Sequence, residues 1–210
     1  MSTYFLSDKK DGGEIKIPIT HITELIINEI SHIGSPDTPE GRTYRIGELV
    51  PHLKQYGNFV EIGAGTGHTT VKLLQRGNKV LVIDPWQSDE QQPPGYGVYS
   101  YDDFKERTKG YNNLVVAKMP SFFKEVEVYL RDITPIAFAL VDGLQYKENV
   151  LSDLFLMAAF GAKVICVDDI NRSTPISQVP EAVEKFLEGN KNYKRVTTRE
   201  DLIECYLIKI

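Results

Sequence analysis

The sequence has few cysteines, no long apolar run and no excess of basic residues. Cys166 and Cys205 are too few for a disulfide framework or a thiolate metal site. No apolar stretch approaches the roughly 20 residues that span a bilayer. The polar start, residues 1–16, lacks the pattern of a signal peptide. We therefore expect a cytoplasmic protein with free thiols and no membrane partner.

The charge balance bears on the class of partner. With 24 Lys and Arg against 29 Asp and Glu, the formal net charge is -5 at pH 7. The sequence has no basic cluster that would displace counterions from phosphates, so we expect no nucleic-acid partner and favour a small-molecule or sugar substrate. The oligomeric state stays open, a homo-oligomer included.

The length of 210 residues suits one domain, which we divide into three parts. Residues 1–19 show little periodicity and are expected to form an irregular arm. Residues 20–56 predict two N-terminal helices, over 20–33 and 42–56. Residues 57–210 alternate β-branched apolar runs with amphipathic segments, which predicts an α/β core ending in a hairpin of 195–198 with 203–208. The aperiodic loop 86–101 is long enough to be a lid.

The most distinctive stretch, residues 59–70, predicts a strand, a tight turn and a helix. Gly63, Gly65 and Gly67 follow an apolar run and precede an amphipathic segment. A turn of this kind approaches a ligand closely, because glycine has no Cβ and the N–H groups of the next helix face outward. The spacing differs from the Gly-x-Gly-x-x-Gly of dinucleotide folds and argues against a nicotinamide cofactor.

Acidic residues end three of the apolar runs. Asp84 ends the run 79–84 and is placed to accept hydrogen bonds from a ribose, since ligands of doubly wound sheets lie outside the strand ends. Asp142 ends the run 136–142, and Asp168 and Asp169 end the next strand run, so these three should meet at one edge of the sheet. Crowded carboxylates raise one another's pKa unless a cation compensates. All-oxygen ligands favour Mg²⁺ or another hard divalent cation.

The pattern acid-x-Gly-x-Gly-x-Gly, in which Glu61 is the acid, resembles the first motif of the class I methyltransferases that use S-adenosylmethionine (SAM). The resemblance implies a single Rossmann-like domain with a seven-stranded, mostly parallel sheet and an antiparallel last strand. It also implies that Glu61 holds the amino end of the cofactor and that Met119 and Ser121 lie beside its adenine. The implied SAM-contacting residues are Glu61, Gly63, Ala64, Gly65, Thr66, Gly67, Asp84, Met119, Ser121 and Asp142.

A second resemblance concerns the acids. The matching positions, in chain order, are Asp142-Gly143, Tyr146, Asp153-Leu154, Gly161 and Asp168-Asp169. This series resembles the metal-dependent O-methyltransferases, above all the macrocin and mycinamicin sugar O-methyltransferases and more distantly catechol O-methyltransferase. It implies that Asp142, Asp168 and Asp169 bind Mg²⁺ and that the reaction is O-methylation of a hydroxyl on a small molecule or sugar.

One position departs from the family pattern. The macrocin-like group has a His and catechol O-methyltransferase a Lys where this chain has Gln145, which cannot accept a proton at neutral pH. Three interpretations stay open: Lys147 acts as the catalytic base, the metal alone acidifies the hydroxyl, or the chemistry has changed or been lost. The alternatives are a metal-independent N- or C-methyltransferase and a non-catalytic SAM-binding module.

Four further residues are candidates for ligand contact, although an ordinary surface pairing or surface position accounts for each of them as well. They are Tyr44 and Arg45 at the start of the second predicted helix, and Asn171 and Arg172 just after the acid pair.

Overall fold

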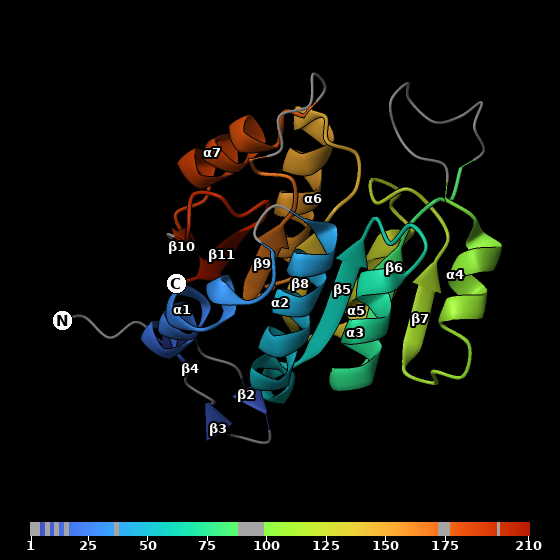
Figure 1. Ribbon diagram of the computed structural model, residues 1–210, viewed down its shortest axis with the longest axis horizontal. Coiled ribbons are helices and arrows are strands. Elements are labelled where there is room, and N and C mark those ends of the chain that lie inside the picture. Colours follow the sequence, from blue (N-terminus) through green and yellow to red (C-terminus); the bar gives the residue numbers. More distant parts are fainter. Residues whose placement is uncertain are drawn as a thin grey trace.

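The structure, a computed structural model, describes residues 5–6, 9–10, 13–14, 17–35, 38–87, 99–171, 177–196 and 198–210. Its main element is a seven-stranded sheet with the strand order β10-β11-β9-β8-β5-β6-β7 (Figure 1). The strands are β5 (Asn58–Ile62), β6 (Val80–Ile83), β7 (Leu114–Ala117), β8 (Ile136–Val141), β9 (Val164–Val167), β10 (Tyr193–Val196) and β11 (Cys205–Lys209). Strands β5 to β9 are parallel, whereas β11 is antiparallel to β9 and β10. The predicted Rossmann-like methyltransferase fold is therefore confirmed.

Strand β5 lies at the point where the strand order reverses. It pairs with β6 on one side and with β8 on the other. In a doubly wound sheet this switch point leaves a crevice at the carboxyl ends of the strands, where ligands bind. All six residues of β8 are buried, as expected of a central parallel strand that is covered on both faces.

Helices cover both faces of the sheet (Figure 1). One face carries α1 (Ile19–Asn28), α2 (Pro39–Leu53), α3 (His68–Arg76) and α4 (Tyr101–Arg107); the other carries α5 (Val126–Ile133), α6 (Lys147–Ala159) and α7 (Val179–Gly189). Each face has its own apolar cluster, with Leu49 and Phe138 in the first and Leu154 and Phe186 in the second. The short 3₁₀ helices η1 (Ile30–His32) and η2 (Lys54–Tyr56) follow α1 and α2.

Several element boundaries differ from the sequence predictions. The first helix ends at Asn28 and continues only as η1, whereas the second begins at Pro39 instead of 42. Thr38 explains the earlier start, because its hydroxyl caps the helix by accepting a hydrogen bond from the Gly41 N–H at 3.1 Å, and proline is favoured at the first helical position. The last hairpin pairs β10 with β11, not 195–198 with 203–208, and Thr197 lies outside the described residues.

The N-terminal segment is not wholly irregular, contrary to the prediction. Strand β1 (Phe5–Leu6) pairs with β4 (Ile17–Pro18), and β2 (Lys9–Lys10) pairs with β3 (Gly13–Glu14). Strands of two residues are too short to leave an alternating pattern in the sequence. Of the predicted lid over 86–101, residues 88–98 lie outside the described part of the chain, and Tyr101 begins α4. None of the helices in the described ranges has the length and apolarity that crossing a membrane requires.

Candidate active site

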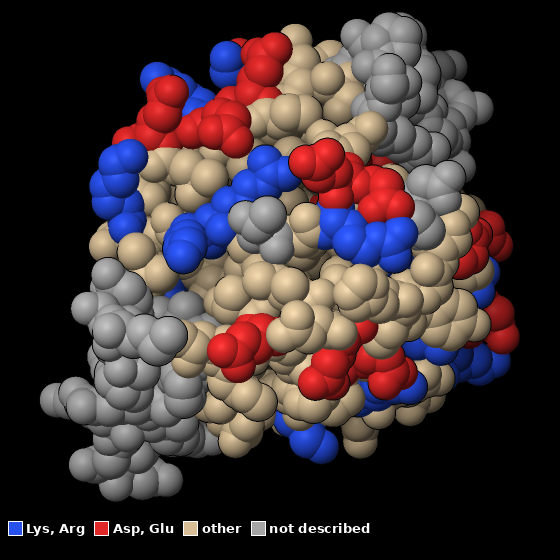
Figure 2. Space-filling view, turned by 60° about the vertical axis from the view of Figure 1, so that its left-hand side comes forward, with Lys and Arg blue, Asp and Glu red and all other residues tan. Residues whose placement is uncertain are grey.

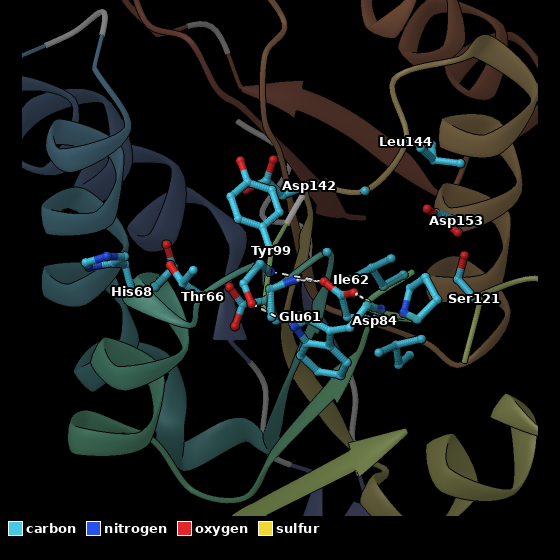
Figure 3. A pocket seen from close by; sticks show the side chains of 18 of the residues that line it. Glu61, Ile62, Thr66, His68, Asp84, Tyr99, Ser121, Asp142, Leu144 and Asp153 are labelled. Carbon is cyan, nitrogen blue, oxygen red and sulfur yellow. Dashed lines mark hydrogen bonds between the residues drawn. The ribbon is translucent and has the colours of Figure 1, made fainter. Parts of the chain in front are cut away.

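A cavity of about 520 Å³ lies at the carboxyl ends of β5, β6 and β8 (Figure 3). Its volume is in the range of small-molecule sites. Of the predicted cofactor residues, those that line it are Glu61, Gly63, Ala64, Gly65, Thr66, Asp84, Ser121 and Asp142. Gly67, Met119, Lys147, Asp168 and Asp169 are described but are not among its lining residues.

Gly63 brings the glycine loop against the end of β8. Its φ angle is +84°, and a Cβ at this position would lie 2.1 Å from the carbonyl oxygen of Asp142. Two features therefore disfavour any side chain at this position: the left-handed backbone conformation and the close contact with the Asp142 carbonyl. The loop and Asp142 consequently form one continuous wall of the cavity.

Glu61 is a buried acid on β5 beside this wall. It is 1% exposed, and the hydroxyl of Thr70 on α3 donates a hydrogen bond to its Oε2 at 2.5 Å. Burial raises the pKa of Glu61 to about 8, which the Thr70 hydrogen bond only partly offsets. The sequence singled out Glu61 but not Thr70. The predicted contact of Glu61 with a cofactor amino group stays a prediction.

Asp84 binds the glycine loop itself. Its Oδ2 accepts hydrogen bonds from the N–H groups of Ala64 and Gly65 at 2.9 and 3.0 Å, and its Oδ1 accepts one from Trp86 at 2.8 Å. The Trp86 indole donates to the Gly65 carbonyl at 2.8 Å. Burial raises the pKa of Asp84, and these backbone donors oppose the shift. Two N–H groups of the glycine loop thus face Asp84, whose ribose contact stays a prediction.

The three acids predicted to meet do meet. Asp142, Asp168 and Asp169, here called the acid trio, each place a carboxylate oxygen within 4.8 Å of the others. Successive side chains of an extended strand point to opposite faces. Asp169 departs from that pattern because its φ angle is +57°, in the left-handed region. With this left-handed residue after β9, the consecutive carboxylates of Asp168 and Asp169 lie in one cluster.

Two donors from outside the predicted set bind the acid trio. Nη1 of Arg42 on α2 donates to Oδ2 of Asp142 at 2.6 Å and also to Oδ2 of Asp168. The Gln145 side-chain amide donates to Asp169. Burial, followed by the charge of Asp142, raises the pKa of Asp168 well above its usual value, and Arg42 opposes that shift. Oδ1 of Asp168 is buried and accepts no hydrogen bond from any described residue.

Asp153 on α6 is a cavity residue that the sequence singled out only as part of a motif. It is 3% exposed, and burial raises the pKa of its carboxyl to about 7, while a hydrogen bond with Ser121 opposes the shift. Figure 3 shows Asp153 and Ser121 together at one end of the cavity. This end of the cavity is therefore polar.

The remaining candidates have other contacts. Nζ of Lys147 lies 3.3 Å from Oε2 of Glu181 on α7. Tyr44 is 56% exposed at the cavity, whereas Arg45 is fully buried and donates to Oε2 of Glu204 at 2.8 Å. Arg45 is therefore paired, but in the interior of the protein and not on the surface as expected.

The residues after the acid pair are divided by the described ranges. The side-chain amide of Asn171 donates to two backbone carbonyls, those of Glu200 and Leu202, each at 2.6 Å. Arg172 lies outside the described residues.

Solved structures share this architecture. An O-methyltransferase from Bacillus cereus in complex with SAH (S-adenosylhomocysteine) superposes with a TM-score of 0.59 at 14% identity, over 92% of this chain and 92% of that one. CalS11, a TDP-rhamnose 3'-O-methyltransferase of calicheamicin biosynthesis, gives 0.53 at 15% identity, over 97% and 96%. An rRNA methylase from Streptococcus thermophilus gives 0.54 at 14% identity, over 84% and 99%.

These similarities show the fold and no more, because the identities are low. No protein-family model matches the chain, and comparison with curated proteins finds no match. Neighbours with sugar and RNA acceptors share the fold, so the fold leaves the acceptor open.

Proposed function

We propose that this chain is a SAM-dependent methyltransferase that methylates a hydroxyl oxygen of a small molecule or sugar, aided by Mg²⁺ or another hard divalent cation at the acid trio. The observation that carries the proposal is the position of Asp142, which lines the cavity and also belongs to the trio. A cofactor bound against the glycine loop would therefore lie next to a site for a cation and an acceptor.

In this proposal the cofactor lies along the cavity wall. Residues 63–67 enclose its methionine part, and Glu61 accepts hydrogen bonds from its ammonium group. Asp84 binds the ribose through the acceptor capacity that its three backbone donors leave, since a carboxylate offers about four lone-pair sites. Ser121 and Met119 lie toward the adenine.

The acid trio fits a hard divalent cation by its donor chemistry. Its ligand atoms are all carboxylate oxygens, and Oδ1 of Asp168 is a buried acceptor without a donor among the described residues. Asp142, Asp168 and Asp169 would hold the cation, and Gln145 would orient Asp169 through its amide. When bound, the cation would supply Lewis-acid stabilisation of negative charge on the acceptor oxygen.

Lys147 is the proposed residue for the acceptor proton. Its ion pair with Glu181 is partly exposed, with the lysine side chain 37% and the glutamate 65% accessible, and pairs of this kind contribute about 1 kcal/mol or less. Such a pair does not prevent Lys147 from turning toward the trio. Lys147→Met should lower the rate of transfer without changing SAH binding, and an unchanged rate would exclude Lys147 as the base.

A small acceptor is proposed on two grounds besides the sugar-modifying neighbour. The formal net charge is -5. On the face shown in Figure 2, groups of Lys and Arg lie beside groups of Asp and Glu. Phosphate backbones are instead bound by surfaces on which basic residues dominate.

The proposal is tested by separating cofactor binding from transfer. Titration calorimetry with SAM and SAH, in Mg²⁺ and then in EDTA, should show micromolar binding of both. Asp168→Ala should abolish metal-dependent transfer yet keep SAH binding, whereas the control Asp102→Ala, in an exposed acid on α4, should keep both. Full transfer activity of Asp168→Ala would rule out the assignment of the acid trio.

A metal-independent transferase is the second candidate, because Arg42 already brings a positive charge to the trio. Activity that is unchanged in EDTA would favour it. A non-catalytic SAM-binding module is the third candidate, because Gln145 stands where the related enzymes have a basic residue. It would bind SAH but transfer no methyl group to any acceptor.

A further inference from the structure

The guanidinium of Arg42 occupies the position between two members of the acid trio. It donates to both Asp142 and Asp168, which lie 100 and 126 positions away in the chain. The Arg42 side chain is 8% exposed, and that of Asp168 is 6% exposed. Removing one partner of such a buried ion pair is costly, because it leaves the other charge buried and uncompensated.

The start of α2 fixes the backbone that carries Arg42. A Cβ on Gly41 would lie 1.8 Å from the Ser35 carbonyl oxygen, so only glycine permits this close approach. One turn further along α2, Arg45 donates to the carbonyls of Ile33 and Ser35, each at 2.9 Å, and to Glu204. The helix therefore presents Arg42 to the trio from a rigid support.

Three carboxylates and one guanidinium sum to two negative charges when all the acids are ionised, which matches the charge of one divalent cation. However, Arg42 and a cation compete for the same oxygens, since Oδ2 of Asp142 and Oδ2 of Asp168 already accept from Nη1. We infer that Arg42 is an internal counter-ion of the acid trio, which leaves Asp142 and Asp168 when a divalent cation binds and thereby sets the affinity of the site for metal. The inference rests on the metal site of the proposed function.

Arg42 has few other contacts that would oppose its release. Apart from its bonds to the two acids, Arg42 makes a long hydrogen bond of 3.5 Å from Nη2 to the Thr69 hydroxyl, and Nε has no partner among the described residues. Arg42 also lines the cavity, so its side chain has space into which it can move. Neutralising the trio therefore removes the main interactions that hold the guanidinium in place.

Calorimetric titration of the full chain with Mn²⁺ and with Mg²⁺ tests the inference. Arg42→Met removes the charge at similar length and should bind Mn²⁺ at least tenfold more tightly than the wild type. Arg42→Lys keeps a positive charge but lacks the planar guanidinium, and its Mn²⁺ affinity should lie between those of the wild type and Arg42→Met. Arg76→Met is the matched control, because Arg76 pairs with Glu48 on the surface, away from the trio, and its Mn²⁺ affinity should equal that of the wild type.

Thermal unfolding provides a second measurement. In EDTA, Arg42→Met should be less stable than the wild type, because the three crowded acids lose the guanidinium charge. Mn²⁺ should then raise the melting temperature of Arg42→Met by more than it raises that of the wild type. If Arg42→Met folds only with Mn²⁺, that result supports the inference. If it does not fold at all, the comparison of Arg42→Lys with the wild type decides: a higher Mn²⁺ affinity supports the inference, and an equal one overturns it.

The outcomes separate this inference from the proposed function. Equal Mn²⁺ affinity in the wild type and Arg42→Met, or weaker binding in the variant, would overturn the counter-ion role and leave the metal site intact. Absence of Mn²⁺ binding in both, with SAH binding retained, would remove the metal site together with the inference and leave cofactor binding standing. Absence of SAH binding would remove the proposed function itself.

Discussion

The two ends of the candidate site satisfy their buried acids in different ways. At the glycine loop, Asp84 is bound by backbone N–H groups, and Glu61 is bound by a threonine nine positions along the chain. At the acid trio, Asp142 and Asp168 are bound by the charged side chain of Arg42 from a distant helix. Neutral donors at most 20 positions away in the chain thus bind the acids at one end, and a cation 100 or more positions away binds those at the other.

This difference predicts different behaviour toward ligands. The donors at the glycine loop belong to the β5–α3 segment and the end of β6, and we expect them to stay in place when the cavity is filled. The trio instead depends on one side chain, that of Arg42, which an incoming cation displaces according to our inference. We therefore expect the glycine loop to be a preformed binding surface and the trio to rearrange on binding.

Replacing Gly63 should have the largest effect, because this residue joins the two ends. Gly63→Ala combines a left-handed backbone with a 2.1 Å contact to the Asp142 carbonyl oxygen, so we expect a loss of about 4 kcal/mol in unfolding free energy and loss of SAH binding. Gly110→Ala is the control: φ is +90° there, but nothing lies within 4 Å, so about 1 kcal/mol is expected. Urea unfolding of both variants measures the difference, and equal losses would contradict the contact.

The second prediction concerns pH. The pKa of Glu61 is raised to about 8 and that of Asp153 to about 7, so the folded state retains protons that the unfolded state has released. Stability from these groups is therefore complete below about pH 4 and falls as the pH rises toward 8. One proton corresponds to about 1.4 kcal/mol per pH unit, so Glu61 alone accounts for a loss of about 3 kcal/mol between pH 5 and 8.

Urea unfolding in EDTA at pH 5, 6.5 and 8 measures this slope. Glu61→Gln and Asp153→Asn should each flatten it, because neither amide titrates. Asp102→Asn, in an exposed acid whose pKa is lowered by Lys105, should leave the slope unchanged. A slope that persists in full in Glu61→Gln would show that Glu61 is ionised throughout this range.

The third prediction is that the two ends of the site bind different ligands, SAH at the glycine loop and Mn²⁺ at the acid trio. Glu61→Gln removes the proposed partner of the cofactor ammonium and should weaken SAH binding by about 10- to 100-fold, the equivalent of about 1.4–2.8 kcal/mol for a charged hydrogen bond. Its Mn²⁺ affinity should stay within about twofold of the wild type. Asp168→Ala should show the reverse pattern in the same titrations. If either variant lost the binding of both SAH and Mn²⁺, the two ends would act as one unit.

The smallest effect is expected at Trp86. Trp86→Phe removes the indole donor to the Gly65 carbonyl but keeps an aromatic ring against Tyr101 and Phe104, whose ring centroids each lie 4.7 Å away. A single neutral hydrogen bond contributes about 1 kcal/mol, and that loss should appear in urea unfolding. Mn²⁺ affinity serves as the control, and a change there would contradict the independence of the two ends.

The amino-acid sequence predicted those features that arise locally or from the parallel topology. Alternating glycines after an apolar run predicted the turn of β5 into α3, and acids at the ends of strand runs predicted the meeting of Asp142, Asp168 and Asp169. Both predictions succeeded because the carboxyl ends of neighbouring parallel strands share one edge of the sheet. The antiparallel last strand followed from the family resemblance, whereas the strand order came from the structure.

Only the tertiary structure revealed the partners of these acids. Nothing in the sequence near Arg42 indicates that its guanidinium binds acids 100 and 126 positions away, because that contact depends on how α2 packs on the sheet. Likewise, Asp84 facing the loop N–H groups and Asp153 lining the cavity depend on side-chain directions that no periodicity specifies. The sequence by itself determined which acids gather at the edge of the sheet, while the packing of helices against that edge decided which donors neutralise them.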